Sequence, residues 1–162
     1  MNRTYTGVGA RKTPNDVLSL MYRIAIKMQH VKYTLRSGGA DGADKAFEQG
    51  TSIKEIYYAN DCTPEAMAIS ALYHPAWHKC GEYAKKLHGR NAFQVLGRQL
   101  NNPSDVLICW TPDACKTHAQ RSWNTGGTGT AISIADAYKV PVVNLAHPED
   151  FKLWDTWAKE AV

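Results

Sequence analysis

Two glycine-rich segments carry the residues best suited to binding an anion. The first is Ser-Gly-Gly-Ala-Asp-Gly-Ala-Asp at 37–44, and the second is Gly-Gly-Thr-Gly-Thr at 126–130. We place each between a strand and a helix, where backbone N–H groups are unpaired, the helix dipole is positive, and glycine admits close approach of a phosphate. The two segments are therefore interpreted as one anion site; tight turns and close helix–strand packing are the alternative use of these glycines.

Neither segment matches a standard nucleotide fingerprint. Gly7-Val8-Gly9 is not completed by a third glycine at the dinucleotide spacing, and no Gly-x-x-x-x-Gly-Lys-Ser/Thr sequence occurs. An ordinary NAD dehydrogenase and a P-loop ATPase are therefore disfavoured.

Several side chains near these segments suit a phosphorylated ligand, and each has a plainer alternative. Arg11 can bind a phosphate through two hydrogen bonds or lie exposed in a loop. Arg90 and Asn91 come directly before a predicted helix, where the Arg90 side chain could pair with a phosphate. Asp41 can accept from a ribose hydroxyl or cap a helix, and Trp110 can stack on a base or join the core. The candidate ligand-binding residues are Gly9, Ala10, Arg11, Ser37, Gly38, Gly39, Ala40, Asp41, Arg90, Asn91, Trp110, Gly126, Gly127, Thr128, Gly129 and Thr130.

The best metal-ligand pattern is weak. His74 and His78 lie four residues apart with Cys80 close by, but Pro75 interrupts the helical spacing and Cys62 is distant, with no partner thiol nearby. We therefore predict no metal site and no cofactor, and free, reduced cysteines because no Cys-x-x-Cys spacing occurs.

The elements that must position these residues alternate between strand and helix. The length of 162 residues and 44% hydrophobic content fit one globular domain over 1–162. Apolar runs predict strands at 4–8, 33–36, 53–59, 105–110 and 140–145. The order predicts an α/β, Rossmann-like fold with a mainly parallel central sheet flanked by helices, and its most apolar strand, 105–110, at the centre.

Helical spacing and capping residues define the helices. Thr13-Pro14-Asn15-Asp16 predicts a Thr13 cap, and Thr63-Pro64 predicts another. The predicted helices are 14–30, 45–49, two within 65–87 broken near 74–75, 91–100, 131–138 and 148–159. The stripe Phe151, Trp154 and Trp157 in the last helix is interpreted as its buried face or as a subunit contact.

The net charge and the lengths of the apolar runs limit the kinds of partner that the chain can have. The net charge of +4 is scattered along the chain, which suits an anionic ligand and argues against a nucleic-acid surface. No apolar run approaches the roughly 18–20 residues that span a bilayer, and the N-terminus lacks the apolar core of a signal peptide. We therefore expect a cytoplasmic protein without membrane contact.

The motifs taken together resemble the SLOG superfamily, a Rossmann-like group that includes the Lonely Guy phosphoribohydrolases and the Rossmann domain of the DNA-processing protein A. The resemblance extends from Tyr5 to about Leu145. Within the superfamily, the chain most resembles the small single-domain SLOG proteins of bacteriophages. It rests on the runs at 5–14, 35–44, 89–91 and 126–130. It implies a nucleotide or nucleotide-derived ligand held over both glycine turns, and a tendency to form homo-oligomers.

One departure from the enzyme branch of that family bears on activity. Lonely Guy enzymes carry a glutamate three residues after the second glycine motif, where this chain has Ser133. A serine hydroxyl neither stabilises an oxocarbenium ion as a carboxylate does nor accepts a proton near neutral pH. Asp41, Asp44 or Asp136 would have to substitute, and we expect Asp44 and Asp136 to face a helix N-terminus or solvent.

The resemblance and this departure favour a binding protein that sequesters a nucleotide-derived signal, ADP-ribose-like or cyclic, as a phage anti-defence protein in the host cytoplasm. The alternative is a nucleoside-monophosphate phosphoribohydrolase or another N-glycosyl hydrolase or transferase. Single-stranded DNA binding in the manner of DNA-processing protein A is a weaker alternative, since no large basic surface is evident.

Overall fold

The computed structural model describes residues 3–160, in which five parallel strands form one sheet in the order β3-β2-β1-β4-β5. The strands are β1 (Thr4–Gly7), β2 (Thr34–Ser37), β3 (Lys54–Ile56), β4 (Val106–Cys109) and β5 (Val142–Asn144). The predicted α/β class with a parallel central sheet is confirmed. After β3 the chain returns to the other side of β1, so the strand order reverses between β1 and β4.

The prediction that the strand at 105–110 is central is wrong by one place. β1 takes the middle, and β4 lies beside it. β1 is the more polar strand, and its polar residue at the centre has a partner inside the fold: the fully buried Thr6 hydroxyl donates to the Gln94 carbonyl at 2.6 Å. A satisfied hydroxyl is tolerated in a core, so apolar content alone does not rank positions in a sheet.

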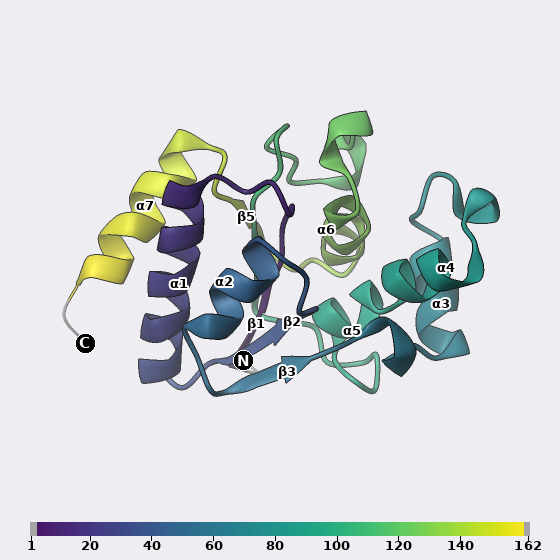
Figure 1. The fold of residues 1–162 in the computed structure, drawn as a ribbon, viewed down its shortest axis with the longest axis horizontal. Helices are drawn as coiled ribbons and strands as arrows, with labels where there is room; N and C mark the ends of the chain where they lie inside the picture. The colour runs from purple at the N-terminus through teal and green to yellow at the C-terminus, as the bar shows by residue number, and fades with distance from the viewer. Residues whose placement is uncertain (1–2, 161–162) are drawn as a thin grey trace.

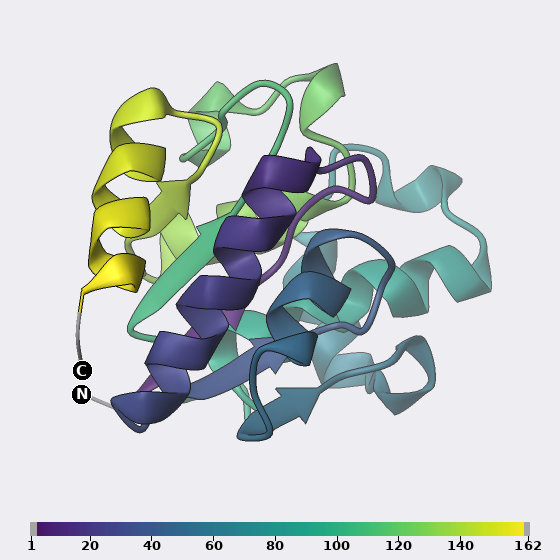
Figure 2. The same cartoon turned by 60° about the vertical axis from the view of Figure 1, so that its left-hand side comes forward.

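Helices cover both faces of the sheet (Figures 1 and 2). On one face, α1 (Asn15–His30), α2 (Ala43–Gln49) and α7 (Pro148–Lys159) pack over Tyr5, Leu35 and Ile108. On the other face, α3 (Pro64–Ala71), α5 (Asn91–Leu96) and α6 (Thr128–Ala137) pack over Leu107 and Cys109, with α4 (Glu82–Gly89) against α3. Both faces are thus removed from water, as parallel sheets require.

Two of the predicted helix ends differ in the structure, and one predicted cap is confirmed. The Thr13 cap is wrong: Thr13 donates its hydroxyl to Ala10 O at 2.6 Å, and Pro14 occupies the cap position of α1 without a side-chain cap. The Thr63 cap is confirmed, since its hydroxyl accepts from the Ala66 N–H. α5 ends at Leu96, short of the predicted residue 100, because Gly97 takes a left-handed φ of 79°.

The aromatic stripe of α7 faces the core and is partly buried. Phe151, Trp154 and Trp157 pack against the core cluster beside α1, and the Lys27 ammonium of α1 lies 4.6 Å from the centre of the Trp157 ring. Lys27 also donates to the Trp157 carbonyl. Among residues 3–160, no helix combines the length and apolar character needed to cross a membrane.

Candidate functional site

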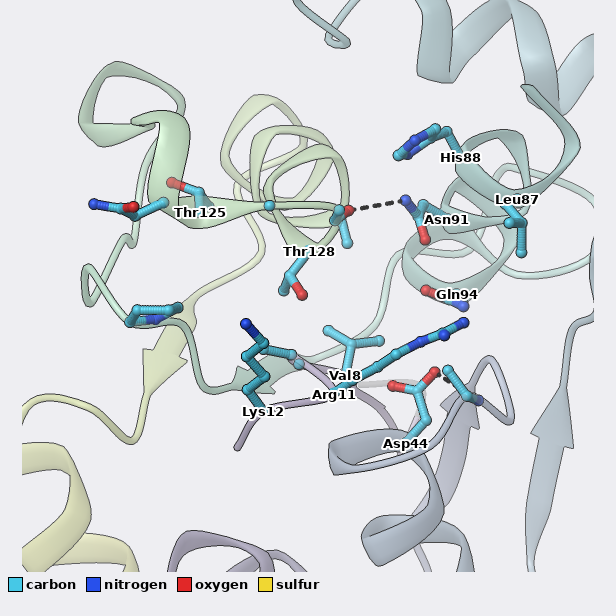
Figure 3. A pocket seen from close by; sticks show the side chains of 18 of the residues that line it. Val8, Arg11, Lys12, Asp44, Leu87, His88, Asn91, Gln94, Thr125 and Thr128 are labelled. Carbon is cyan, nitrogen blue, oxygen red and sulfur yellow. Dashed lines mark hydrogen bonds between the residues drawn. The ribbon is translucent and has the colours of Figure 1, made fainter. Parts of the chain in front are cut away.

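A cavity of about 560 Å³ opens at the carboxyl ends of β1, β2 and β4, where the strand order reverses. Its walls are the β1–α1 loop, the start of α2, the end of α4 with α5, and the turn that begins α6 (Figure 3). Open α/β sheets bind ligands at this place. The structure brings to it the predicted residues Gly9, Ala10, Arg11, Ala40, Arg90, Asn91, Gly126, Gly127 and Thr128.

Three cationic side chains line the cavity. Arg11 and Lys12 come from the β1–α1 loop, and Figure 3 shows both reaching into the cavity. Arg90, at the junction of α4 and α5, donates from Nη1 to Gly38 O at 2.5 Å and to Tyr57 O at 3.2 Å. Its Nε is buried and has no hydrogen-bond partner among the described residues. Arg90 is thus fixed by the ends of β2 and β3, and its buried Nε donor stays unused.

Asp44 supplies the one acid on the cavity wall within the described residues. Its carboxylate accepts from the Ala40 N–H at 3.3 Å, and its residue is 4% exposed. Burial raises the pKa of Asp44 to about 6, although the Ala40 N–H and the charge of Arg90 act to lower it. Asp44 does lie at a helix N-terminus, as predicted, but it is buried beside the cavity, so it can exchange a proton near neutral pH.

The first turn of α5 adds two amides. Asn91 Nδ2 donates to Gly127 O at 3.5 Å, which links α5 to the turn before α6. Gln94 lines the cavity, and its Oε1 is buried without a partner among residues 3–160. Sequence reasoning missed Gln94 and Lys12. The signal for Gln94 was its position four residues after Arg90, which places both on one side of a helix.

The turn at 126–128 presents open backbone to the cavity. Gly126 has a left-handed φ of 68°, and a Cβ there would meet nothing within 4 Å. A Cβ on Gly127 would meet only His88 Cε1, at 3.7 Å. α6 begins at Thr128, three residues earlier than predicted, so its N-terminal N–H groups belong to this turn. The turn is therefore shaped to admit a group close to the backbone.

Asp113 holds the preceding loop in place. Its carboxylate accepts from the hydroxyls of Ser122, at 2.6 Å, and Thr125. Burial alone would raise the pKa of Asp113, but these hydrogen bonds hold it below its usual value. Trp123 in this loop is 96% exposed at the edge of the cavity, a position that sequence reasoning did not identify.

The remaining predicted residues do not line the cavity. Ser37 is fully buried and donates its hydroxyl to Gly7 O at 2.6 Å, and a Cβ on Gly39 would meet the Tyr58 ring at 2.9 Å. Trp110 packs with the cluster under α1 and α7. The others are Gly38, packed under Arg90; Asp41, which is exposed; and Gly129 and Thr130, which face Arg121. Position in a glycine motif thus does not fix which way a residue faces.

Ser133, at the position of the family glutamate, also lies outside the cavity lining. It is fully buried, its hydroxyl is 2.7 Å from His118 Nδ1, and it accepts from Arg121 Nη1 at 3.2 Å. Asp136 is exposed and accepts from the His118 N–H at 2.9 Å. Neither residue can act on a ligand in the cavity as the structure stands.

The comparisons with known proteins found no matching family model, no matching curated protein and no matching solved structure. The site therefore has to be interpreted from its own geometry.

Proposed function

We propose that the chain binds a nucleotide or nucleotide-derived molecule in the cavity at the carboxyl ends of β1, β2 and β4. Phosphate groups would lie between Arg11, Lys12 and the open turn at Gly126–Gly127. The ligand would be held without turnover, because the position of the enzyme-branch glutamate is a buried serine that faces away from the cavity.

The observation that carries this proposal is the meeting of two cationic side chains, Arg11 and Lys12, with the open backbone of Gly126 and Gly127 at one cavity. Cationic side chains and unpaired N–H groups at the start of a helix are the partners that a phosphate prefers. Arg90 Nε and Gln94 Oε1 are shut off from solvent and lie behind this surface, so the groups that a phosphate would contact are those of the β1–α1 loop and of the turn before α6.

The resemblance to phage SLOG proteins supports a further proposal about role. The molecule held would be an immune signal of the ADP-ribose or cyclic nucleotide kind, and its sequestration would blunt a host defence.

A second candidate function is N-glycosyl hydrolysis, and Asp44 is the observation that favours it. A buried carboxyl with a pKa of about 6 can donate a proton to a leaving base near neutral pH. In this alternative the acid of the enzyme branch has moved from α6 to α2.

One experiment separates the two. The protein is incubated with AMP and with ADP-ribose, denatured, and the released molecules are identified by mass spectrometry. Recovery of intact nucleotide in a 1:1 ratio with protein supports sequestration. Free base that disappears in Asp44→Asn supports hydrolysis, and the absence of both bound nucleotide and free base contradicts the site.

The loss of Arg11 tests the phosphate contact. Arg11 is exposed, so Arg11→Ala should leave the fold intact while removing a charge-assisted hydrogen bond worth about 1.5–3 kcal/mol, or roughly ten- to a hundredfold in affinity. Isothermal titration with the nucleotide bound by the wild type measures this. Lys152→Ala, which removes an exposed cation from α7, is the charge-matched control and should bind like the wild type.

A further inference from the structure

We propose that His74, Cys80 and His88 form a binding site for a divalent transition-metal ion, zinc above all. One ligand atom from each residue lies within 4.8 Å of the other two. Cys80 Sγ is 3.9 Å from His74 Nε2, and the rings of His74 and His88 are 4.3 Å apart at their centres. These separations need only a small contraction around an ion, because zinc binds sulfur at about 2.3 Å and imidazole nitrogen at about 2.0 Å.

The three residues come from different parts of the α3–α4 region. His74 follows α3, Cys80 follows a short 3-10 turn at Trp77–Lys79, and His88 lies near the end of α4. The sequence pattern had paired His74 with His78, but Pro75 prevents the helix that this spacing needs. His78 is exposed and outside the cluster, and His88 takes its place.

The donor set defines the chemistry of the ion. Two imidazole nitrogens and one thiolate suit zinc and its neighbours and disfavour magnesium and calcium, which prefer oxygen. Three protein ligands leave the fourth tetrahedral position for water or another donor. The positive charge of Arg121 acts on both imidazoles and repels a bound cation. The negative charge of a Cys80 thiolate attracts the cation and offsets this repulsion.

Two local contacts must be given up, and the first is the weak hydrogen bond that the Cys80 thiol donates to Ala76 O at 3.6 Å, which a thiolate cannot make. In the second, His74 Nδ1 accepts from the Ala76 N–H at 3.1 Å. An ion on Nδ1 displaces this bond, and an ion on Nε2 moves the ring proton to Nδ1, so the Ala76 N–H loses its acceptor in either case. The loss of each such bond lowers affinity by about tenfold or less, which is small beside the affinity of structural zinc sites.

The ion would stabilise a weakly packed part of the molecule. The 3-10 turn between α3 and α4 has no buried residue, so few apolar contacts hold this connection. His88 also lines the cavity next to Gly127. A metal at this cluster would cross-link the connection to α4 and fix one wall of the cavity.

Metal titration of the full chain tests the proposal without any nucleotide. The protein is stripped with a chelator and titrated with Zn²⁺ against a chromophoric competitor, and with Co²⁺ to detect thiolate-to-metal charge transfer. We expect one equivalent to bind the wild type. His78→Ala is the matched control and should bind alike, whereas Cys80→Ser and His74→Ala should lose more than about a hundredfold in affinity.

Thermal unfolding gives a second measurement. Zn²⁺ should raise the melting temperature of the wild type and of His78→Ala but not of Cys80→Ser, whose near-isosteric side chain should leave the apo fold unchanged. The proposal is overturned if the wild type binds no Zn²⁺, or if Cys80→Ser binds and responds to Zn²⁺ as the wild type does. Since neither readout involves a nucleotide, failure here would leave the proposed function standing.

Discussion

Asp44 combines burial with a place on the cavity wall, and this makes the stability of the protein depend on pH. The pKa of Asp44 is about 6 in the folded chain and near 3.8 when the carboxyl is exposed. Between these values the folded state binds more protons than the unfolded state, so the contribution of Asp44 to stability falls as pH rises from about 4 to 7. The fall amounts to about 3 kcal/mol over the whole titration, and about 2 kcal/mol of it lies between pH 4 and pH 7.

Asp44→Asn should remove this fall. The free energy of unfolding of the wild type, relative to that of Asp44→Asn, should therefore decrease by about 2 kcal/mol between pH 4 and pH 7, as measured by urea denaturation at a series of pH values. Asp41→Asn removes an exposed carboxyl from the same segment and should follow the wild type. Parallel profiles for the wild type and Asp44→Asn would contradict a raised pKa.

At the scale of elements, the two glycine turns have different tasks. The turn at 126–128 opens onto the cavity at the start of α6, whereas Gly39 packs beneath Tyr58 with a left-handed φ of 71°. Because the two turns are similar in composition, we predicted one role for both from the sequence. Their surroundings differ, so a substitution in the turn at 126–128 should affect ligand binding and a substitution at Gly39 should affect stability.

Gly127→Val should place a side chain in the cavity and lower nucleotide affinity by more than about tenfold. The φ of Gly127 is −64°, which any residue adopts, so the melting temperature of Gly127→Val should be close to that of the wild type. Gly39→Ala should instead lower stability by about 1–3 kcal/mol, because of its φ and the nearby Tyr58 ring. Calorimetric titration and thermal unfolding of both variants provide the check; equal loss of binding at normal stability in both would place the ligand over Gly39 too.

At the scale of the whole molecule, α7 packs its aromatic stripe against α1 and the core, and all three aromatic residues stay partly exposed. Trp154 and Trp157 lie with their ring centres 5.3 Å apart, and Lys27 holds the end of α7 through the Trp157 carbonyl. We expect these contacts to be those of one subunit, and the homo-oligomer stays a prediction.

Trp157→Ala should lower the free energy of unfolding by about 2–3 kcal/mol through lost packing. The mass in analytical ultracentrifugation should stay that of the wild type. Leu153→Ala, at a position 66% exposed on the same helix, is the control and should change stability by less than about 0.5 kcal/mol. A fall in mass for Trp157→Ala would show instead that α7 joins subunits.

The alternation of apolar strands and capped helices determined the α/β class, because each crossover helix must return the chain to start a parallel neighbour. The same order placed the segments at 37–44 and 126–130 at one edge of the sheet, so Ala40 and Gly127 meet at one cavity as expected. Pro148 and the aromatic spacing likewise located α7 and the face that it packs against the core, since these signals are local.

Only the tertiary structure decided which side chains share the cavity. Ser37 turned inward to a β1 carbonyl, and Gln94 came to the wall from α5. His88 joined His74 from a helix away, while the nearer His78 did not. Each outcome depends on packing between segments distant in sequence, and the spacing of residues within one segment does not tell which residues of another segment that segment will meet.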